Sequence, residues 1–231
     1  MSWSWRREAF LFLPVAAMFV ASAIAWPFAD DSIPVHWNAI GEADRYGGKF
    51  EGLLLVPMIA AGVWLLLAFL PRVDPGRANY ASFAGTYTLI RAGALLFLGV
   101  LHGLVLAIAL GANIDLARAL YVAVGLLFLL LGNVMAKLRP NYFAGIRTPW
   151  TLASARSWTA THRVGGRAFV GFGLGFLLMA LVYQAWFLIL VMVGFGLSLV
   201  WLFYYSYRVW RDDPDRVPVG QTTPADPADH R

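Results

Sequence analysis

The chain has 231 residues, of which 60% are hydrophobic and 13% are charged, and its formal net charge is +5. A soluble domain would carry about 25% charged residues, so this composition excludes an ordinary soluble fold. Cysteine is absent, which excludes disulfides, thiol nucleophiles and thiolate metal sites. The charges lie in short clusters between uncharged runs of ~20 residues, the length that crosses a ~30 Å hydrocarbon core. We therefore expect an all-α, polytopic integral membrane protein, and its basic charge does not imply direct nucleic-acid binding.

About six membrane spans are predicted in chain order. They lie at 9–29, 52–71, 92–114 and 119–136, with two more in the uncharged run 168–207. That run would form ~60 Å of helix, too long for one crossing, so we expect a turn near Tyr183 and Gln184. The first run contains Ala21-Ser22-Ala23, which resembles a signal cleavage site, but its length favours a retained helix. Residues 208–231 are rich in Asp and Pro and predict a disordered tail.

The distribution of basic residues predicts the orientation. Fifteen of the eighteen Lys and Arg residues fall in the N-terminus, the second and fourth connections and the tail. Only Arg45, Lys49 and Arg118 fall on the opposite side, together with six acidic residues. Because short cytoplasmic segments carry the excess of basic residues, both termini are predicted to be cytoplasmic.

The first connection, residues 30–51, is an acidic outer loop with five acidic and two basic residues. Its candidate interaction residues are His36, Trp37, Asn38 and Asp44. An acidic, outward-facing loop suits a cationic peptide or toxin, for which Trp37 would supply contact area.

His36 and Asp44, together with Glu42, are also metal-ligand types. Their spacing matches no tight ligand motif, and zinc sites need three or four converging ligands. No metal and no other cofactor is therefore predicted.

The fourth connection is the most basic part of the chain. The stretch from Gly132 to Arg167 holds six basic residues and no acidic one. Within it, Pro149 favours a helix start, and Ser154, Trp158 and His162 share one helical face. A segment of this kind can lie in the headgroup layer, or it can bind a partner with Trp and Arg.

Two stretches of the chain resemble known families. The run PVHWN at 34–38, with Gly41, Asp44 and residues 46–49, resembles the domain of unknown function DUF1648, over about the first sixty residues. The motifs GN at 132–133, RPN at 139–141, GIRTPWT at 145–151, Trp158 and THR at 161–163 resemble the SdpI-like bacterial immunity family, over roughly the C-terminal half. A DUF1648 part commonly precedes the SdpI-like part, so the two resemblances support each other.

The resemblance implies a division of the chain into four parts. Residues 1–71 form a DUF1648-like part with two spans and the outer loop, and residues 72–118 form a connecting region with the third span. Residues 119–207 form the SdpI-like part with three spans and the basic inner loop 137–167, and residues 208–231 form a cytoplasmic tail.

The resemblance also implies a function. It suggests a multi-pass protein of the bacterial cytoplasmic membrane that protects the cell from a secreted peptide toxin, and that also captures a cytoplasmic repressor as a signalling receptor. The candidate inner-loop interaction residues are Asn133, Asn141, Arg147, Trp150, Trp158, Thr161, His162 and Arg163. Between positions 152 and 158, this chain has Ala, Ser and Arg where the family usually carries acidic residues, so a charge-specific contact there is not expected.

A transporter or lipid-handling protein is the alternative reading. His102 lies near the centre of the third span, where an ionisable residue marks either a functional site or a hydrogen bond between helices. The pairs Gly99/Gly103 and Gly171/Gly175 have the spacing that lets helices approach closely, although glycine is also simply common in membrane helices. No catalytic motif stands out, so the chain is predicted not to be an enzyme.

Overall fold

The computed structural model describes residues 5–38 and 42–220, and it consists of helices with one short hairpin. The elements are α1 (Trp5–Ala25), β1 (Ile33–Trp37), β2 (Ala43–Gly47), α2 (Lys49–Val73), η1 (Arg77–Ala81), α3 (Ala84–Ala109), α4 (Leu116–Met135), α5 (Pro149–Leu152), α6 (Ala155–Val182) and α7 (Ala185–Arg211). Six of these helices are long and apolar enough to cross a membrane. The predicted all-α, polytopic membrane fold is confirmed.

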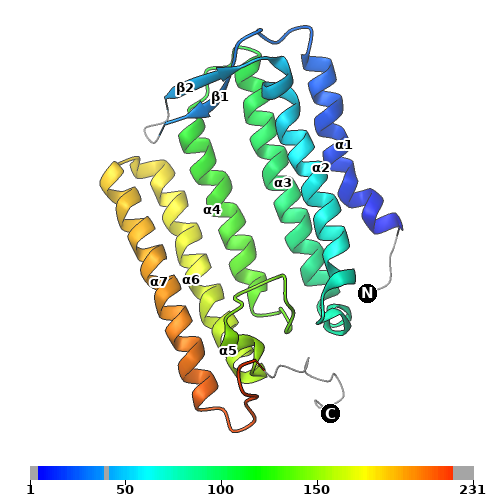
Figure 1. Ribbon diagram of the computed structural model, residues 1–231. Coiled ribbons are helices and arrows are strands. Elements are labelled where there is room, and N and C mark those ends of the chain that lie inside the picture. Colours follow the sequence, from blue (N-terminus) through cyan, green and yellow to red (C-terminus); the bar gives the residue numbers. More distant parts are fainter. Residues whose placement is uncertain (1–4, 39–41, 221–231) are drawn as a thin grey trace.

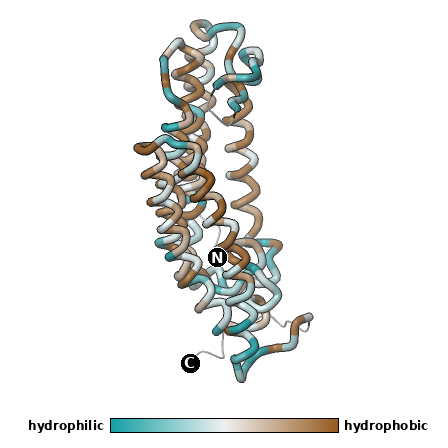
Figure 2. Tube along the Cα trace, turned by 90° about the vertical axis from the view of Figure 1, so that its left-hand side faces the viewer, coloured by the Kyte–Doolittle hydropathy of each residue, from teal (hydrophilic) through white to brown (hydrophobic). Residues whose placement is uncertain are grey.

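The helices form two groups of three that stand side by side (Figure 1). Helices α1, α2 and α3 make the first group, α4, α6 and α7 make the second, and α3 contacts α4 across the boundary. The antiparallel hairpin β1–β2 lies at one end of the molecule, which we call the hairpin end. The opposite end holds η1, α5 and the connection 136–154, and we call it the loop end. Hydrophobic residues line the middle of the molecule and hydrophilic residues gather at both ends (Figure 2).

Helix α6 begins at Ala155 rather than near Ala168, so the second half of the predicted inner loop is helical. The hydroxyl of Ser154 accepts a hydrogen bond from the backbone N–H of Ser157, which caps the new helix start. The predicted break near Tyr183 is confirmed, because Tyr183 has a left-handed backbone with φ 48° and ends the helix.

Close helix packing occurs between α4 and α6, the helix pair with the most extensive contact. A Cβ at Gly132 would lie 2.7 Å from the carbonyl oxygen of Gly166, and a Cβ at Gly166 would lie 2.7 Å from that of Gly132. Gly125 and Gly173 repeat this arrangement toward the hairpin end, at 2.9 and 2.8 Å. Only glycine allows the two backbones to approach this closely.

The glycine pairs predicted from the sequence do not make such contacts. Positions Gly99, Gly103 and Gly171 face open space, and a Cβ at Gly175 would make an ordinary 3.4 Å contact with Val191. The four-residue spacing is therefore not the packing signal in this chain, and the seven-residue spacing on α4 and α6 is.

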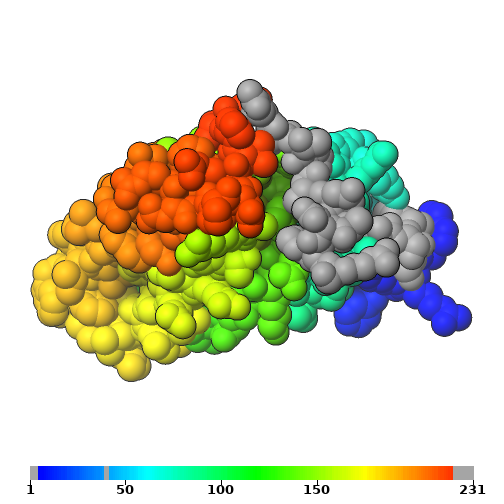
Figure 3. Space-filling model, turned by 90° about the horizontal axis from the view of Figure 1, so that it is seen from below, coloured from blue at the N-terminus to red at the C-terminus, as the bar shows by residue number. Residues whose placement is uncertain are grey.

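The prediction of a disordered tail from Arg208 is wrong for the residues up to 217. Helix α7 continues to Arg211, and the chain then folds back so that the N–H of Val217 donates to the carbonyl of Ala153. The view from below shows the end of α7 lying beside the segment that contains α5 (Figure 3). Residues 221–231 of the predicted tail lie outside the described residues.

Candidate functional site

The first part of the inner loop is a turn built around Asn141, whose side chain is buried. Its amide nitrogen donates to the carbonyls of Arg139 and Ala144, and its side-chain oxygen accepts from the N–H groups of Phe143 and Ala144. One side chain therefore satisfies four backbone groups that a helix or strand would otherwise pair with other backbone groups. The loop has a defined shape although it lacks regular structure.

Asp74 joins the two helical groups at the loop end. Its buried carboxylate accepts from the N–H of Gly76 and the hydroxyl of Tyr80 in the first group, and from the N–H of Tyr142 in the second. Nearby, the amide of Asn79 donates to the carbonyl of Pro140 at 2.8 Å. The sequence does not single out Asp74, because an Asp-Pro-Gly run after a span looks like an ordinary surface turn.

Burial raises the pKa of Tyr80, and its hydrogen bond to Asp74 raises it further. The hydroxyl therefore keeps its proton and remains a donor to the carboxylate at physiological pH. Tyr80 also packs with Phe83, Tyr87, Leu138 and Trp158 in a buried cluster that both groups share. Polar and apolar contacts thus fix the same junction.

The loop is also hydrogen-bonded to Trp158 and His162 of α6. The Trp158 indole is buried, donates to the carbonyl of Leu138 at 2.9 Å and stacks on the His162 ring at 4.1 Å. The N–H of Ile146 donates to Nε2 of His162, so Nε2 must accept and Nδ1 must carry the hydrogen that reaches the carbonyl of Trp158. A Cβ at Gly145, where φ is 108°, would collide with this ring.

Hydrogen bonds join α5, the start of α6 and the end of α7 at the loop end. Thr148 and Thr151 form a reciprocal capping box at the start of α5, and the Thr148 hydroxyl lies 2.9 Å from that of Ser206 on α7. The hydroxyl of Ser154 donates to the carboxylate of Asp213. The C-terminal segment is therefore tied to the starts of both α5 and α6.

Arg147 lies on the surface of the loop end. Its Nη1 donates to the carbonyl of Tyr142 at 2.6 Å, and its side chain is exposed. Trp150 is half-buried and makes edge contacts with Phe203 and Tyr207 of α7. Because Tyr142 also binds Asp74, Arg147 is connected to the junction of the two groups through one residue.

The predicted inner-loop residues thus have three different placements. Asn141, Trp158 and His162 are buried and shape the loop, whereas Arg147, Trp150 and Arg163 are at least partly accessible. Thr161 is buried, and its hydroxyl has no hydrogen-bond partner among the described residues. Asn133 is exposed, and its side-chain amide donates to the carbonyl of Leu129 in its own helix, so that hydrogen bond does not reach the loop.

The predicted outer-loop residues lie in the hairpin, which the sequence did not predict. His36 and Asp44 face each other across the strands, with Nδ1 2.5 Å from Oδ1, and both are exposed. Asn38 is half-buried and bonds to Glu42, and Trp37 is half-buried. Within residues 5–38 and 42–220, no three His, Cys, Asp or Glu side chains gather as a metal site. Ile33 anchors the hairpin by packing between Leu53 and Leu106 in the first group.

His102 takes part in a buried contact among the three helices of the first group. Its Nε2 lies 3.1 Å from both the Ser22 hydroxyl and the Met18 carbonyl on α1, and Ser22 donates to the carbonyl of Leu53 on α2. A carbonyl can only accept, so Nε2 carries the hydrogen. This arrangement favours a structural role for His102, in which its ring forms hydrogen bonds between helices.

The sequence also gave no sign of an ion pair between α1 and α3. Arg91 binds Glu8 through both terminal nitrogens, at 2.9 and 2.5 Å, and both side chains are almost fully buried. The two residues are 83 positions apart, so no local pattern connects them. Removing one partner of such a buried pair strongly destabilises the fold, because the other charge is left buried and unpaired.

The fold and its contacts define a polytopic helical membrane protein whose two halves meet at a polar junction beneath a basic surface. Residues 137–205 match the SdpI/YfhL protein family, and residues 9–61 match DUF1648, a domain of unknown function. The match to SdpI is therefore preceded by the match to DUF1648, in the order that the sequence predicted.

Among curated proteins, the chain is similar to the immunity protein SdpI of Bacillus subtilis (strain 168). The two are 22% identical over 197 residues, which cover 85% of this chain and 92% of that protein. No solved structure matches the chain.

Proposed function

We propose that this chain is an immunity protein of the bacterial cytoplasmic membrane that gives resistance to a secreted peptide toxin. The observation that carries the proposal is the extent of the similarity to an immunity protein, over 85% of this chain and 92% of the relative. A match of 85% of the chain overlaps both family segments, so it is more than one shared module. The role is binding, not catalysis.

The proposal assigns the loop end to the cytoplasm. Lys137, Arg139 and Arg147 lie there, Arg156, Arg163 and Arg167 lie on the first half of α6, and the positive-inside bias supports that assignment. The hairpin would then face the outside and present its acidic groups to a cationic toxin. A guanidinium offers a planar fork of donors that suits a carboxylate, so Arg147 would meet a cytoplasmic repressor protein.

Two observations that suggested a transporter no longer support that function. The Nε2 of His102 is engaged by Ser22 and Met18, and three of the four paired glycines face open space. A binding role accounts for the ordered loop end without a path through the membrane.

Survival of a toxin-sensitive bacterial host tests the function directly. Cells that express this chain should survive a toxin challenge that kills cells carrying the empty vector. Normal membrane levels of the chain without any protection would refute the proposal.

Cysteine labelling tests the orientation independently, because the chain has no cysteine of its own. Asp44→Cys and Arg163→Cys place thiols at exposed positions at opposite ends. An impermeant thiol reagent should label position 44, but not position 163, in intact spheroplasts. The reverse pattern would overturn the assignment of the loop end to the cytoplasm.

A further inference from the structure

Helix α2 contains two prolines, and each of them removes one hydrogen bond from the helix. Pro57 and Pro71 both lie inside α2. A proline has no backbone N–H, so the carbonyl four residues earlier loses its usual helical partner. The carbonyls concerned are those of Leu53 and Leu67. Inside a membrane, such a carbonyl needs a donor from the protein, because the lipid chains supply none.

Side-chain hydroxyls from the two neighbouring helices supply these donors. Ser22 of α1 donates to the carbonyl of Leu53 at 2.6 Å, and Tyr87 of α3 donates to the carbonyl of Leu67 at 2.7 Å. Ser22 and Tyr87 are both buried. The two hydroxyls therefore have a common role, since each replaces the N–H that a proline of α2 removes.

His102 orients the Ser22 hydroxyl toward α2. Its Nε2 carries a hydrogen and lies 3.1 Å from the Ser22 oxygen, which can accept from it while the hydroxyl hydrogen points to Leu53. The Met18 carbonyl also lies 3.1 Å from Nε2, so the ring keeps an acceptor when the serine hydroxyl is removed. The buried contact around His102 thus ends on the carbonyl that Pro57 leaves unpaired.

Helix α2 links the hairpin to the polar junction at the loop end. It follows β2 after a single residue, and Asp74 comes directly after its last residue. The carboxylate of Asp74 accepts from Tyr142 of the other helical group. A bend within α2 would therefore change the position of the hairpin relative to the junction (Figure 1).

The first turns of α2 are attached to the hairpin. Arg45 pairs with Glu51 at 2.8 Å, and a Cβ at Gly52 would lie 2.8 Å from the Ile33 side chain. The hairpin and these turns form one unit, which ends at Pro57. Sharp bends in helices occur most often at proline, so this position is suited to a hinge.

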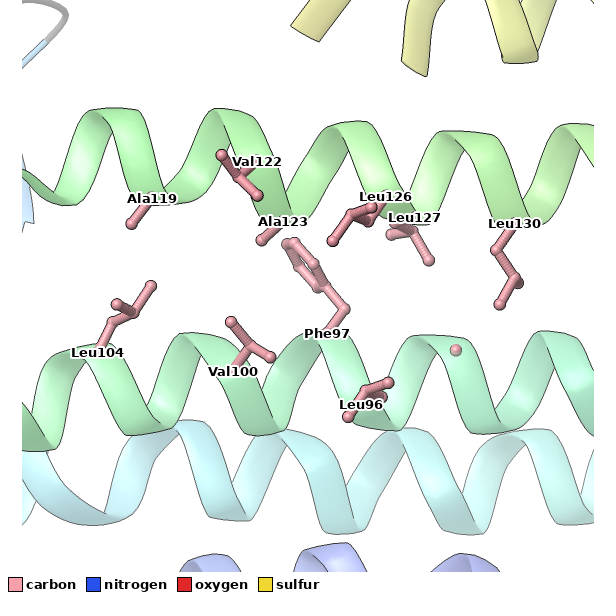
Figure 4. A pocket seen from close by; sticks show the side chains of 11 residues that line it. Leu96, Phe97, Val100, Leu104, Ala119, Val122, Ala123, Leu126, Leu127 and Leu130 are labelled. Carbon is pink, nitrogen blue, oxygen red and sulfur yellow. The ribbon is translucent and has the colours of Figure 1, made fainter. Parts of the chain in front are cut away.

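The neighbours of α2 are the helices that carry the two hydroxyls. Helix α2 packs against α1 and α3, and it lies on the side of α3 away from α4 (Figure 4). An apolar groove, lined by residues that include Phe97 and Leu126, lies between the facing sides of α3 and α4. The bend angle of α2 is thus set by its contacts with α1 and α3, including the bonds from Ser22 and Tyr87.

We propose that Pro57 is a hinge in α2 that the Ser22 hydroxyl holds closed. Breaking the bond from Ser22 to Leu53 lets the hairpin and the first turns of α2 rotate as one unit relative to α3 and α4. The bond from Tyr87 closes the second proline site, near the junction, in the same way. The hinge does not require the hairpin to bind a toxin, so it is independent of the proposed function.

A double-mutant cycle, measured by thermal unfolding in detergent, tests the hydrogen bond at the hinge. Ser22→Ala removes the donor, whereas Pro57→Ala restores a backbone N–H for Leu53. Ser22→Ala should lower the unfolding temperature by several degrees, but by less than half as much when Pro57→Ala is present. Ser198→Ala, which removes a hydroxyl that donates within its own helix, is the control and should have the same effect in both backgrounds. Equal losses for Ser22→Ala in both backgrounds would overturn the proposal.

A second pair of variants keeps the test valid if Ser22→Ala fails to fold. Tyr87→Phe preserves the ring that packs against Tyr80 and Phe83 and loses only the hydroxyl. Its loss in unfolding temperature should also shrink when Pro71→Ala restores the missing N–H. An undiminished loss would mean that the hydroxyl does not replace the helical bond, which contradicts the common role.

Spin labels measure the movement itself, in the full chain in nanodiscs. Tyr46→Cys on β2 and Asn113→Cys between α3 and α4 place the labels at exposed positions of a chain that has no other cysteine. The distribution of distances between the labels should be narrow in the parent chain and should broaden or shift with Ser22→Ala. It should become narrow again when Pro57→Ala is added. An unchanged distribution with Ser22→Ala, or equal broadening with and without Pro57, would overturn the hinge.

Discussion

The hairpin end and the connection 137–167 use their basic residues in opposite ways. At the hairpin end, Arg45, Lys49 and Arg118 are all ion-paired, with Glu51, Asp31 and Asp115 respectively. At the loop end, the six basic residues from Lys137 to Arg167 form no ion pair with any described residue. Order at the loop end comes instead from neutral side chains and from the carboxylates Asp74 and Asp213, which accept from uncharged donors.

This difference shows how a basic surface can be both ordered and available. Exposed ion pairs contribute little stability and neutralise the charges that they use. Buried hydrogen bonds from Asn141, Thr151 and His162 hold the loop without consuming a cation. The guanidinium of Arg147 donates to the carbonyl of Tyr142 through Nη1 but forms no ion pair with a described residue, so its other N–H groups can bind an anionic group, as the proposed repressor contact requires.

The largest expected effect tests the helix packing on which the loop end rests. Gly166→Leu would push a side chain into the backbone of α4, at a cost of ~3 kcal/mol or more, and should prevent folding. Gly171→Leu on the same helix faces open space and is the matched control. Monodisperse protein recovered in detergent measures the effect. Equal recovery of the two variants would contradict the described α4–α6 contact.

The second-largest effect is expected from the removal of Asp74, because three donors would lose their buried acceptor. Asp74→Ala should lower the free energy of unfolding by ~3 kcal/mol, since a buried unsatisfied group costs ~1–3 kcal/mol. Asp44→Ala, at the exposed hairpin, should cost less than ~1 kcal/mol. Thermal unfolding in detergent compares them. A smaller loss for Asp74→Ala than for Asp44→Ala would reverse the contrast between the two ends.

The C-terminal segment should show a smaller effect. Asp213→Ala removes the acceptor of the Ser154 hydroxyl and should cost ~1 kcal/mol, as loss of a helix cap does. Arg211 and Arg216 are already exposed, and local opening should free the backbone beside them, so trypsin should cleave there faster than in the wild type. Asp212→Ala, which lies at an exposed position, is the control. Unchanged cleavage after Asp213→Ala would mean that this contact does not hold the segment.

The smallest effect is expected from the exposed charges of the hairpin. His36→Gln breaks an exposed contact with Asp44 and should change stability by less than ~1 kcal/mol. Ile33→Ala should cost ~2–5 kcal/mol, because that residue is the buried anchor of the hairpin. Thermal unfolding of the pair shows whether the hairpin is held by its apolar contact or by its exposed charges.

The sequence predicts the features that depend on local composition. Runs of apolar residues gave six spans, and the position of Tyr183 and Gln184 in a long uncharged run gave the last turn. The family motifs also located the loop that Asn141, Trp158 and His162 shape. These residues are rare in membrane segments, so their presence was informative in itself.

Features that depend on contacts between distant residues were not predictable. Asp74 meets Tyr142 across 68 positions, and Ser154 meets Asp213 across 59. The tail looked disordered because its composition is polar, although Asp213 and Val217 dock onto the loop end. Helix α6 was predicted too short because Arg156 and Arg163 look like loop residues, although a helix that extends beyond the membrane tolerates both.

Survival under toxin challenge, with Arg147→Lys compared with Arg163→Lys, tests whether Arg147 binds a cytoplasmic partner. Both changes keep the positive charge at an exposed position of the loop end, but only Arg147 is held by Tyr142 above the junction with Asp74. A lysine cannot keep that bond and also offer a planar pair of donors to a partner. At equal membrane levels, Arg147→Lys should lose protection and Arg163→Lys should retain it. Full protection by Arg147→Lys would show that the loop end attracts only lipid headgroups and would contradict the proposed repressor contact.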